Sequence, residues 1–154
     1  MPIKSFQAAR QKLVPKRRKS LLVQDYMSRN LITFSPQQSI LEVMRVLIRH
    51  KISGGPVVDE LSRLIGIISE ADCIKHLSDA KYFNQPFFDR KVEESMSAEV
   101  DVIEADKTIF DAATLFHKTG RRRLPVLERG RLVGQISRQD VVKAALLLRS
   151  QRWR

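Results

Sequence analysis

The stretches IISEAD, at residues 67–72, and QISRQD, at residues 135–140, decide how this chain is organised. Each follows an apolar run and places an aspartate three residues after a serine, as Ser69 with Asp72 and as Ser137 with Asp140. This spacing is typical of a helix N-terminus, because the two side chains satisfy backbone N–H groups of the first turn. Two unrelated helices can share such a cap. The residues around the two stretches therefore decide whether a larger unit is repeated.

The surrounding residues also come in pairs. Three pairs lie 69 residues apart (96 − 27): Met27 and Met96, Ile40 and Ile109, and Pro56 and Pro125. Beyond the prolines the separation falls to 68 (140 − 72), because the turn DELSRLIG has one residue more than its counterpart ERGRLVG. Surface turns tolerate such deletions. The sequence therefore predicts five segments: a basic arm at 1–22, a first repeat at 23–77, a linker at 78–91, a second repeat at 92–148 and a basic tail at 149–154.

Each repeat carries the signals of a strand, a helix, two strands and a second helix. The stretches SILEVMRVLIRH and TIFDAATLFHKT open with capping patterns and continue with apolar residues at helical spacing. Two short runs rich in β-branched residues follow, joined by a polar turn. In the second of these runs, Gly66 and Gly134 predict close backbone packing. One repeat has too little core alone, so we expect an α/β fold with the two repeats packed together.

The composition indicates a globular protein. An apolar content of 43% in 154 residues is enough for an interior. The single cysteine, Cys73, makes no internal disulfide, which suits a reducing, cytoplasmic location, and we expect it to be packed rather than reactive. No apolar run approaches the roughly 20 residues that cross a bilayer, and no secretory signal is recognisable. We find no nucleophile–base set, metal cluster or phosphate loop, so we do not expect an enzyme.

The net charge of +11 is concentrated at the two ends of the chain. Ten of the 28 basic residues lie in residues 1–22 and 149–154, and neither segment contains an acidic residue. The rest of the chain then has 18 basic residues (28 − 10) against 17 acidic ones, so it is nearly neutral. The basic ends can bind nucleic acid or an anionic membrane surface, or they can be solvated arms.

The order, spacing and duplication of these motifs resemble a tandem cystathionine β-synthase (CBS) domain pair, also called a Bateman module. The matching features are the Met-Ser pairs at 27–28 and 96–97, the proline-led strands GGPVVD and RLPVLE, and the two Ser-x-x-Asp motifs. The resemblance covers residues 23–148. It implies two repeats related by a pseudo-twofold axis and packed through their sheets, with two clefts between them. In many members these clefts hold AMP, ADP, ATP or S-adenosylmethionine, with no obligatory cofactor, and the module regulates another protein.

The resemblance also implies how the site residues are shared. Ser137 and Asp140 would share one cleft with Ser53, Gly54 and Gly55. In the other, Ser69 and Asp72 would face Arg122 and Arg123. The residue chemistry fits independently, because an aspartate at a helix start can accept hydrogen bonds from a ribose diol and helix N-termini favour phosphate. Glycines let a flat base approach the backbone, whereas arginines offer positive charge to phosphates. The plainer interpretation is that both motifs are ordinary caps and that the arginines form a solvated basic edge.

Two functions from different classes follow. The first is a stand-alone regulatory module that binds an adenine nucleotide or related adenosyl ligand, forms a homodimer through its apolar helices and modulates a partner protein. The second is a nucleic-acid or anionic-surface adaptor in which the basic ends bind and the repeats serve as a scaffold.

Overall fold

The computed structural model describes residues 20–83 and 88–152. The binding role considered for the basic ends falls mainly on residues 1–19 and 153–154, which lie outside the described residues. Within the described part, no helix is both long enough and apolar enough to cross a membrane.

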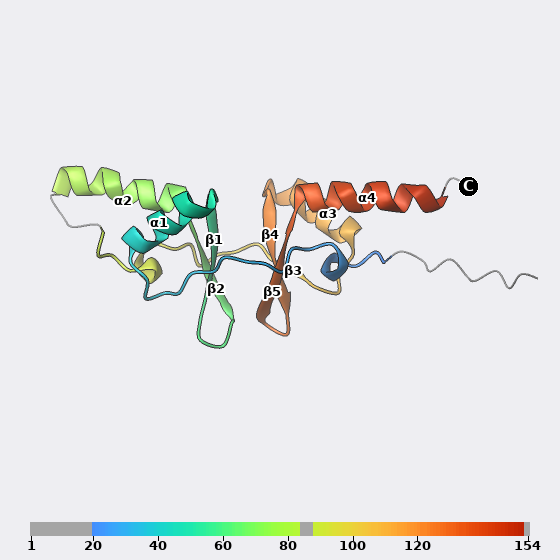
Figure 1. Ribbon diagram of the computed structural model, residues 1–154, viewed down its shortest axis with the longest axis horizontal. Helices are drawn as coiled ribbons and strands as arrows, with labels where there is room; N and C mark the ends of the chain where they lie inside the picture. Colours follow the sequence, from blue (N-terminus) through green and yellow to red (C-terminus); the bar gives the residue numbers. More distant parts are fainter. Residues whose placement is uncertain (1–19, 84–87, 153–154) are drawn as a thin grey trace, which may run out of the picture.

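The described chain is an α/β fold of two halves, which confirms the expected class (Figure 1). The first half contains the 3-10 helix η1 (Val23–Asp25), α1 (Ile40–His50), β1 (Gly54–Val58), β2 (Leu64–Ser69) and α2 (Glu70–Phe83). The second contains η2 (Val92–Glu94), β3 (Ile103–Glu104), α3 (Ile109–Thr119), β4 (Arg123–Glu128), β5 (Arg131–Ser137) and α4 (Arg138–Arg152). The boundaries expected at residues 77 and 148 fall inside α2 and α4, because neither helix contains a glycine or proline to end it there.

The capping signals of the sequence start the inner helices. Ser39 accepts a hydrogen bond from the N–H of Glu42 at the start of α1, at 3.2 Å. At the start of α3, Thr108 and Asp111 satisfy each other's backbone N–H groups in a full capping box. The hydrogen bonds from the Thr108 N–H and hydroxyl lower the pKa of the Asp111 carboxyl. Both helices begin where the sequence predicts, although only α3 has the reciprocal pair of cap bonds.

The strands form one antiparallel hairpin in the first half and a three-stranded sheet in the second. The pair β1–β2 is antiparallel, and the order β3–β4–β5 has β3 parallel to β4. The expected first strand of the first half is reduced to a single parallel bridge between Phe34 and Val57. Proline explains the difference: Ala105 donates its N–H to the carbonyl of Leu127, whereas Pro36, at the equivalent position, has no N–H to extend the ladder.

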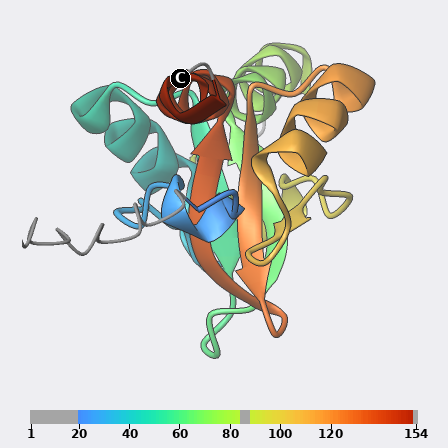
Figure 2. The ribbon, with the colours of Figure 1, turned by 90° about the vertical axis from the view of Figure 1, so that its right-hand side faces the viewer.

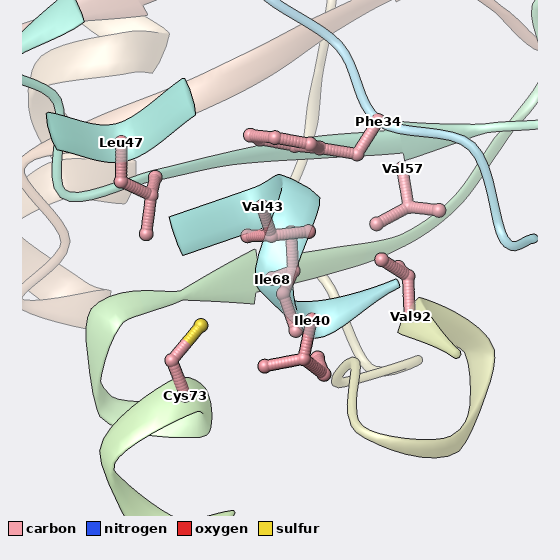
Figure 3. Close-up of a cluster of buried hydrophobic side chains, with 8 residues drawn as sticks. All are labelled: Phe34, Ile40, Val43, Leu47, Val57, Ile68, Cys73 and Val92. Atoms are coloured by element: carbon pink, nitrogen blue, oxygen red, sulfur yellow. The ribbon is translucent and has the colours of Figure 1, made fainter. Parts of the chain in front are cut away.

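The two halves exchange their leading segments. The N–H of Val23, in η1, donates to the carbonyl of Lys107 at 2.8 Å, and Val23 is fully buried in the core of the second half. Reciprocally, the N–H of Val92, in η2, donates to the carbonyl of Gln38 at 2.8 Å, and Val92 is buried in the first core (Figure 3). Each sequence repeat therefore supplies one buried side chain to the core of the other.

Cys73 belongs to the same first core. Figure 3 shows its thiol among the aliphatic side chains of the cluster, where the residue is only 4% exposed. Burial raises the pKa of the thiol, so the unreactive neutral form is favoured. The expected packing role is confirmed.

The exchanged segments cross the second strand of each hairpin at a glycine. Ser28 and Gln135 exchange two backbone hydrogen bonds of 2.9 Å, and Ser97 and Ile67 make the equivalent pair. A Cβ atom on Gly134 would lie 2.9 Å from the Ser28 carbonyl oxygen and closer still to the Met27 sulfur. Gly66 is crowded in the same way by Met96 and Ser97. The close packing predicted at both glycines is confirmed, and the partner is the other repeat.

The helices gather on one side of the molecule and the hairpin turns lie at the other. Figure 1 shows α2 and α4 along the same side, and the end view in Figure 2 shows α1 and α3 on opposite flanks. Between the hairpins, the N–H of Leu132 donates to the carbonyl of Ser62 at 3.0 Å. The halves are thus joined through both their sheets and their exchanged leading segments.

We predict that Gly134→Ala lowers the free energy of unfolding by about 1–3 kcal/mol, because the added methyl group collides with the Met27–Ser28 segment. Urea denaturation monitored by circular dichroism measures the change. Arg131→Ala is the matched control, since Arg131 is an exposed residue of the same strand. Equal stabilities of the Gly134→Ala variant and the wild type would contradict the proposed crossing.

Candidate ligand-binding cleft

A cleft of about 280 Å³ lies where the two halves meet. Its wall combines the segment that follows the crossing of residues 27–28 over Gly134, the start of β1, and the junction of β5 with α4. The lining residues are Ser28, Asn30, Leu31, Ile32, Ile52, Gly54, Pro56, Arg123, Gln135, Ser137 and Asp140. Contributions from both halves mean that the cleft exists only when the halves are packed together.

Ser137 and Asp140 lie at the start of α4, where they cap the helix and line the cleft. The Ser137 N–H donates to Asp140 Oδ2 at 2.8 Å, and the Asp140 N–H donates to Ser137 Oγ at 3.1 Å. Within the described residues, no donor contacts the second carboxylate oxygen of Asp140 and no acceptor takes the Ser137 hydroxyl proton. The cap therefore leaves one acceptor and one donor for a ligand, beside a helix N-terminus that favours anions.

Ser69 and Asp72 form the equivalent cap at the start of α2. The Ser69 N–H and the Asp72 N–H make the same two bonds, at 2.8 and 3.4 Å. In addition, the Ser69 hydroxyl donates to Asp72 Oδ2 at 3.0 Å, so its proton is already used. Neither residue lines the cleft described above. The two motifs are alike as caps but differ in what they leave for a ligand.

Arg123 does not lie where the sequence reasoning placed it. We expected it in a cleft with Ser69 and Asp72, but it lines the cleft that holds Ser137 and Asp140. The reason is the β4–β5 register, which pairs Arg123 directly with Ser137. The expected division between a glycine-walled cleft and an arginine-walled cleft is therefore wrong. One cleft contains both Gly54 and Arg123.

The glycine wall also needs correction. Gly54 lines the cleft with Ser137 and Asp140 as expected, but Ser53 and Gly55 are not among its lining residues. A Cβ atom on Gly55 would lie 2.9 Å from the ring of Phe34 and 3.0 Å from the Ile32 carbonyl oxygen. Its small size therefore serves packing against the first core. Ser53 accepts a hydrogen bond through its carbonyl from the Glu70 N–H, at 2.8 Å.

Arg122 is exposed and does not line the cleft either. Its carbonyl accepts a hydrogen bond from the Arg138 N–H at 3.1 Å, which ties β4 to the start of α4. Of the predicted site residues, the structure thus brings together Gly54, Arg123, Ser137 and Asp140.

The sequence reasoning missed the apolar wall of the cleft. Ile32 and Ile52 are half-buried and pack against the first core while they line the cleft. Ser28 and Asn30 enter the wall because residues 27–28 cross β5 at Gly134. The Met-Ser pair was visible in the sequence, but its crossing of the other half was not. The cleft thus combines an apolar wall, a carboxylate and a guanidinium, which suits a ligand with a flat ring, a diol and a phosphate.

A larger hollow of about 590 Å³ lies elsewhere, between residues 33–38 and the turn after β1. Three of its polar side chains, Gln37, Gln38 and Asp59, already accept hydrogen bonds within the chain. Asp59 accepts hydrogen bonds from the N–H groups of Leu61 and Arg63 and forms an ion pair with the Arg63 side chain at 2.8 Å. These bonds, chiefly that from the Arg63 N–H, lower the pKa of Asp59. The smaller cleft is the better candidate because both halves line it and because it holds a carboxylate at a helix start.

Comparison with known proteins identifies the relatives of this fold. The CBS domain family matches the chain twice, at residues 23–79 and 91–147. The uncharacterized protein MJ1426 of Methanocaldococcus jannaschii is 29% identical over 155 residues, which cover 82% of this chain and 92% of that protein. The chloroplastic CBS domain-containing protein CBSX2 of Arabidopsis thaliana is 27% identical and covers 90% of this chain and 69% of the relative.

Two solved structures with bound ligands are similar to this one. The crystal structure of CBSX2 in complex with AMP superposes with a TM-score of 0.72 at 29% identity, covering 84% of this chain and 99% of that chain. The CBS domain pair of protein MJ0100, in complex with 5′-methylthioadenosine and S-adenosyl-L-methionine, gives a TM-score of 0.64 at 30% identity. That alignment covers 80% of this chain and 94% of the other.

Proposed function

This chain belongs to the CBS domain family as a tandem pair, and we propose that it binds an adenine nucleotide or a related adenosyl ligand in the cleft that holds Asp140. The two similar structures contain AMP in one case and 5′-methylthioadenosine with S-adenosyl-L-methionine in the other. These ligands share an adenine ring and a ribose diol. The observation that carries the proposal is the meeting of Asp140, Arg123 and the Ile32–Ile52 wall in one cleft.

Each part of the ligand has a matching group in the cleft. Asp140 Oδ1 accepts the ribose hydroxyls, and charge-assisted hydrogen bonds of this kind contribute roughly 1.5–3 kcal/mol each. The Arg123 guanidinium and the start of α4 suit a phosphate group. Ile32 and Ile52 offer apolar surface to the adenine ring. AMP, ADP, ATP and S-adenosylmethionine are therefore the ligands to test, and none serves as an obligatory cofactor.

We further propose that ligand binding changes how the chain associates with a partner protein. The cleft lies between the two halves, so a ligand that contacts both adds to the forces that hold them together. Its residues provide binding groups and no nucleophile–base pair, which favours a regulatory role over a catalytic one. The nucleic-acid adaptor receives no support from the family match or from the similar structures, and we do not propose it.

A second copy of the chain is the first partner that we propose. α2 exposes Ile74 and Leu77 at 62% and 53%, and α4 exposes Val142 and Leu146 at 59% and 62%. Both helices lie along the same side of the molecule, so one partner surface can contact both (Figure 1). α1 contributes little to such a face because Ile40, Val43 and Leu47 are buried in the core. Exposed large apolar side chains on two helices of one side suit an interface.

We predict that Asp140→Ala weakens AMP binding by roughly tenfold or more, because the ribose loses its charged acceptor. Isothermal titration calorimetry with AMP, ADP, ATP and S-adenosylmethionine measures the affinities. Asp72→Ala is the matched control, since it removes the same cap from the other half. If the wild type binds none of the four ligands at millimolar concentration, the proposed function is wrong.

The Arg123→Ala variant should lose affinity for ADP and ATP more strongly than for adenosine, because the guanidinium acts on the phosphates. Arg122→Ala controls for the loss of a positive charge, since Arg122 is its exposed neighbour outside the cleft. The same titrations, with adenosine added to the panel, measure the difference. Equal losses for adenosine and ATP would remove Arg123 from the phosphate position.

For the homodimer, we expect Leu146→Glu to shift the protein from dimer to monomer, because a buried unpaired carboxylate opposes association. Sedimentation velocity measures the mass in solution. Ile48→Glu is the control, because Ile48 is 81% exposed but lies on α1. A monomeric wild type, or a Leu146→Glu variant that stays dimeric, would exclude this interface.

A further inference from the structure

The two halves allow a residue-by-residue comparison of the cleft wall. Phe34 bridges Val57 and Ile103 bridges Val126, so these positions correspond at a separation of 69 (103 − 34). The Ser28–Gln135 bridge is mirrored by the Ser97–Ile67 bridge. Each wall residue of the cleft therefore has a counterpart near Ser69 and Asp72. We call the counterparts of the wall residues between 28 and 52 the second wall: Ser97, Glu99, Val100, Asp101 and Arg121.

The second wall replaces an apolar pair with an ion pair. Ile32 and Ile52, which pack on the first core and line the cleft, correspond to Asp101 and Arg121. The Arg121 guanidinium donates to Asp101 Oδ2 at 3.0 Å, and the two side chains are 60% and 41% exposed. A purine ring laid face-on against this pair would remove water from the Asp101 carboxylate, to which the face of the ring offers no hydrogen-bond donor. The isoleucine pair presents no such obstacle.

Electrostatics reinforces the difference. Asn30 of the first cleft corresponds to Glu99, and Arg138 at the start of α4 corresponds to Glu70 at the start of α2. Glu70, Glu99 and Asp101 are therefore three carboxylates whose counterparts around the first cleft carry no negative charge. Arg121 is already paired with Asp101, and Arg123, which corresponds to Gly54, lines the first cleft. Negative charge at close range repels a phosphate, even when solvent screens much of it.

The hydroxyl groups of the two motifs agree with this division. The Ser69 hydroxyl donates its proton to Asp72, whereas the structure gives the Ser137 hydroxyl proton no acceptor among the described residues. A ligand at Ser137 thus gains a hydrogen bond without breaking one, and a ligand at Ser69 must compete with Asp72.

We infer that each chain binds a single nucleotide, in the cleft at Asp140, and that Ile32 with Ile52 and Asp101 with Arg121 are the specificity-determining pairs. The other Ser-x-x-Asp motif, Ser69 with Asp72, then acts as a helix cap only. This inference rests on the proposed function, because it assigns the adenosyl ligand to one of two related positions.

The first experiment is the binding stoichiometry of AMP and ATP, measured by calorimetry on the full chain. We expect one ligand per chain in the wild type, a loss of roughly tenfold or more in Asp140→Ala, and unchanged affinity in Asp72→Ala. Two ligands per wild-type chain, or equal losses in the two variants, would overturn the inference and leave the proposed function intact. Absence of any binding would overturn both.

The second experiment transfers the walls. Asp101→Ile combined with Arg121→Ile keeps the net charge, and Glu99→Asn removes the second carboxylate of the wall. This triple variant should gain a second AMP site, because its second wall then carries the same side chains as the first except for Val100, an apolar residue that corresponds to Leu31. The three side chains are at least partly exposed, so we expect little change in the stability of the fold. Thermal denaturation checks that stability. A folded triple variant that still binds one AMP would show that these residues are not the barrier.

The reverse transfer, Ile32→Asp with Ile52→Arg, should reduce AMP affinity by roughly tenfold or more while Asp140 is unchanged. Both residues touch the core, so the single variant Ile52→Ser is measured beside it as the milder change. A folded protein of either kind with wild-type AMP affinity would contradict the role of the isoleucine wall.

Discussion

The crossing of each leading segment over a glycine of the other repeat is the constraint on which the rest of the structure depends. Met27 and Ser28 pass so close to Gly134 that no side chain fits there, and Met96 and Ser97 pass Gly66 in the same way. The crossing carries Val23 and Val92 into the opposite cores. It therefore links the stability of each half to the presence of the other, and it brings residues 28–32 beside the start of α4.

The same crossing makes the cleft out of residues that are distant in sequence. Asn30 and Ile32 come from the first half, whereas Arg123, Ser137 and Asp140 come from the second. Asp140 caps α4 with one carboxylate oxygen, and the other has no donor among the described residues, so the structural role is compatible with the binding role that we propose. A ligand held by both halves would strengthen their packing, which is the physical basis of the regulation that we propose.

The two halves are more alike in their backbone structure than in the side chains at their surface. Caps, hairpin registers and glycine crossings recur, since each is required for packing. The wall positions are free of that requirement. There, Ile32 and Ile52 correspond to Asp101 and Arg121, and the charged pair remains accessible to water at the surface. Two halves with the same fold can thus present one apolar wall and one charged wall.

The sequence by itself determined the repeats, the order of helices and strands, the caps at Ser39 and Thr108, and the close packing at Gly66 and Gly134. These depend on local spacing and on residues whose backbone chemistry is the same in any context. Its resemblance to the CBS family also implied that Gly54, Ser137 and Asp140 share a cleft. Only the tertiary structure decided that Arg123 joins them and that Gly55 serves the core. The physical reason is strand register and chain crossing, which join residues far apart in sequence through hydrogen bonds that no local pattern encodes.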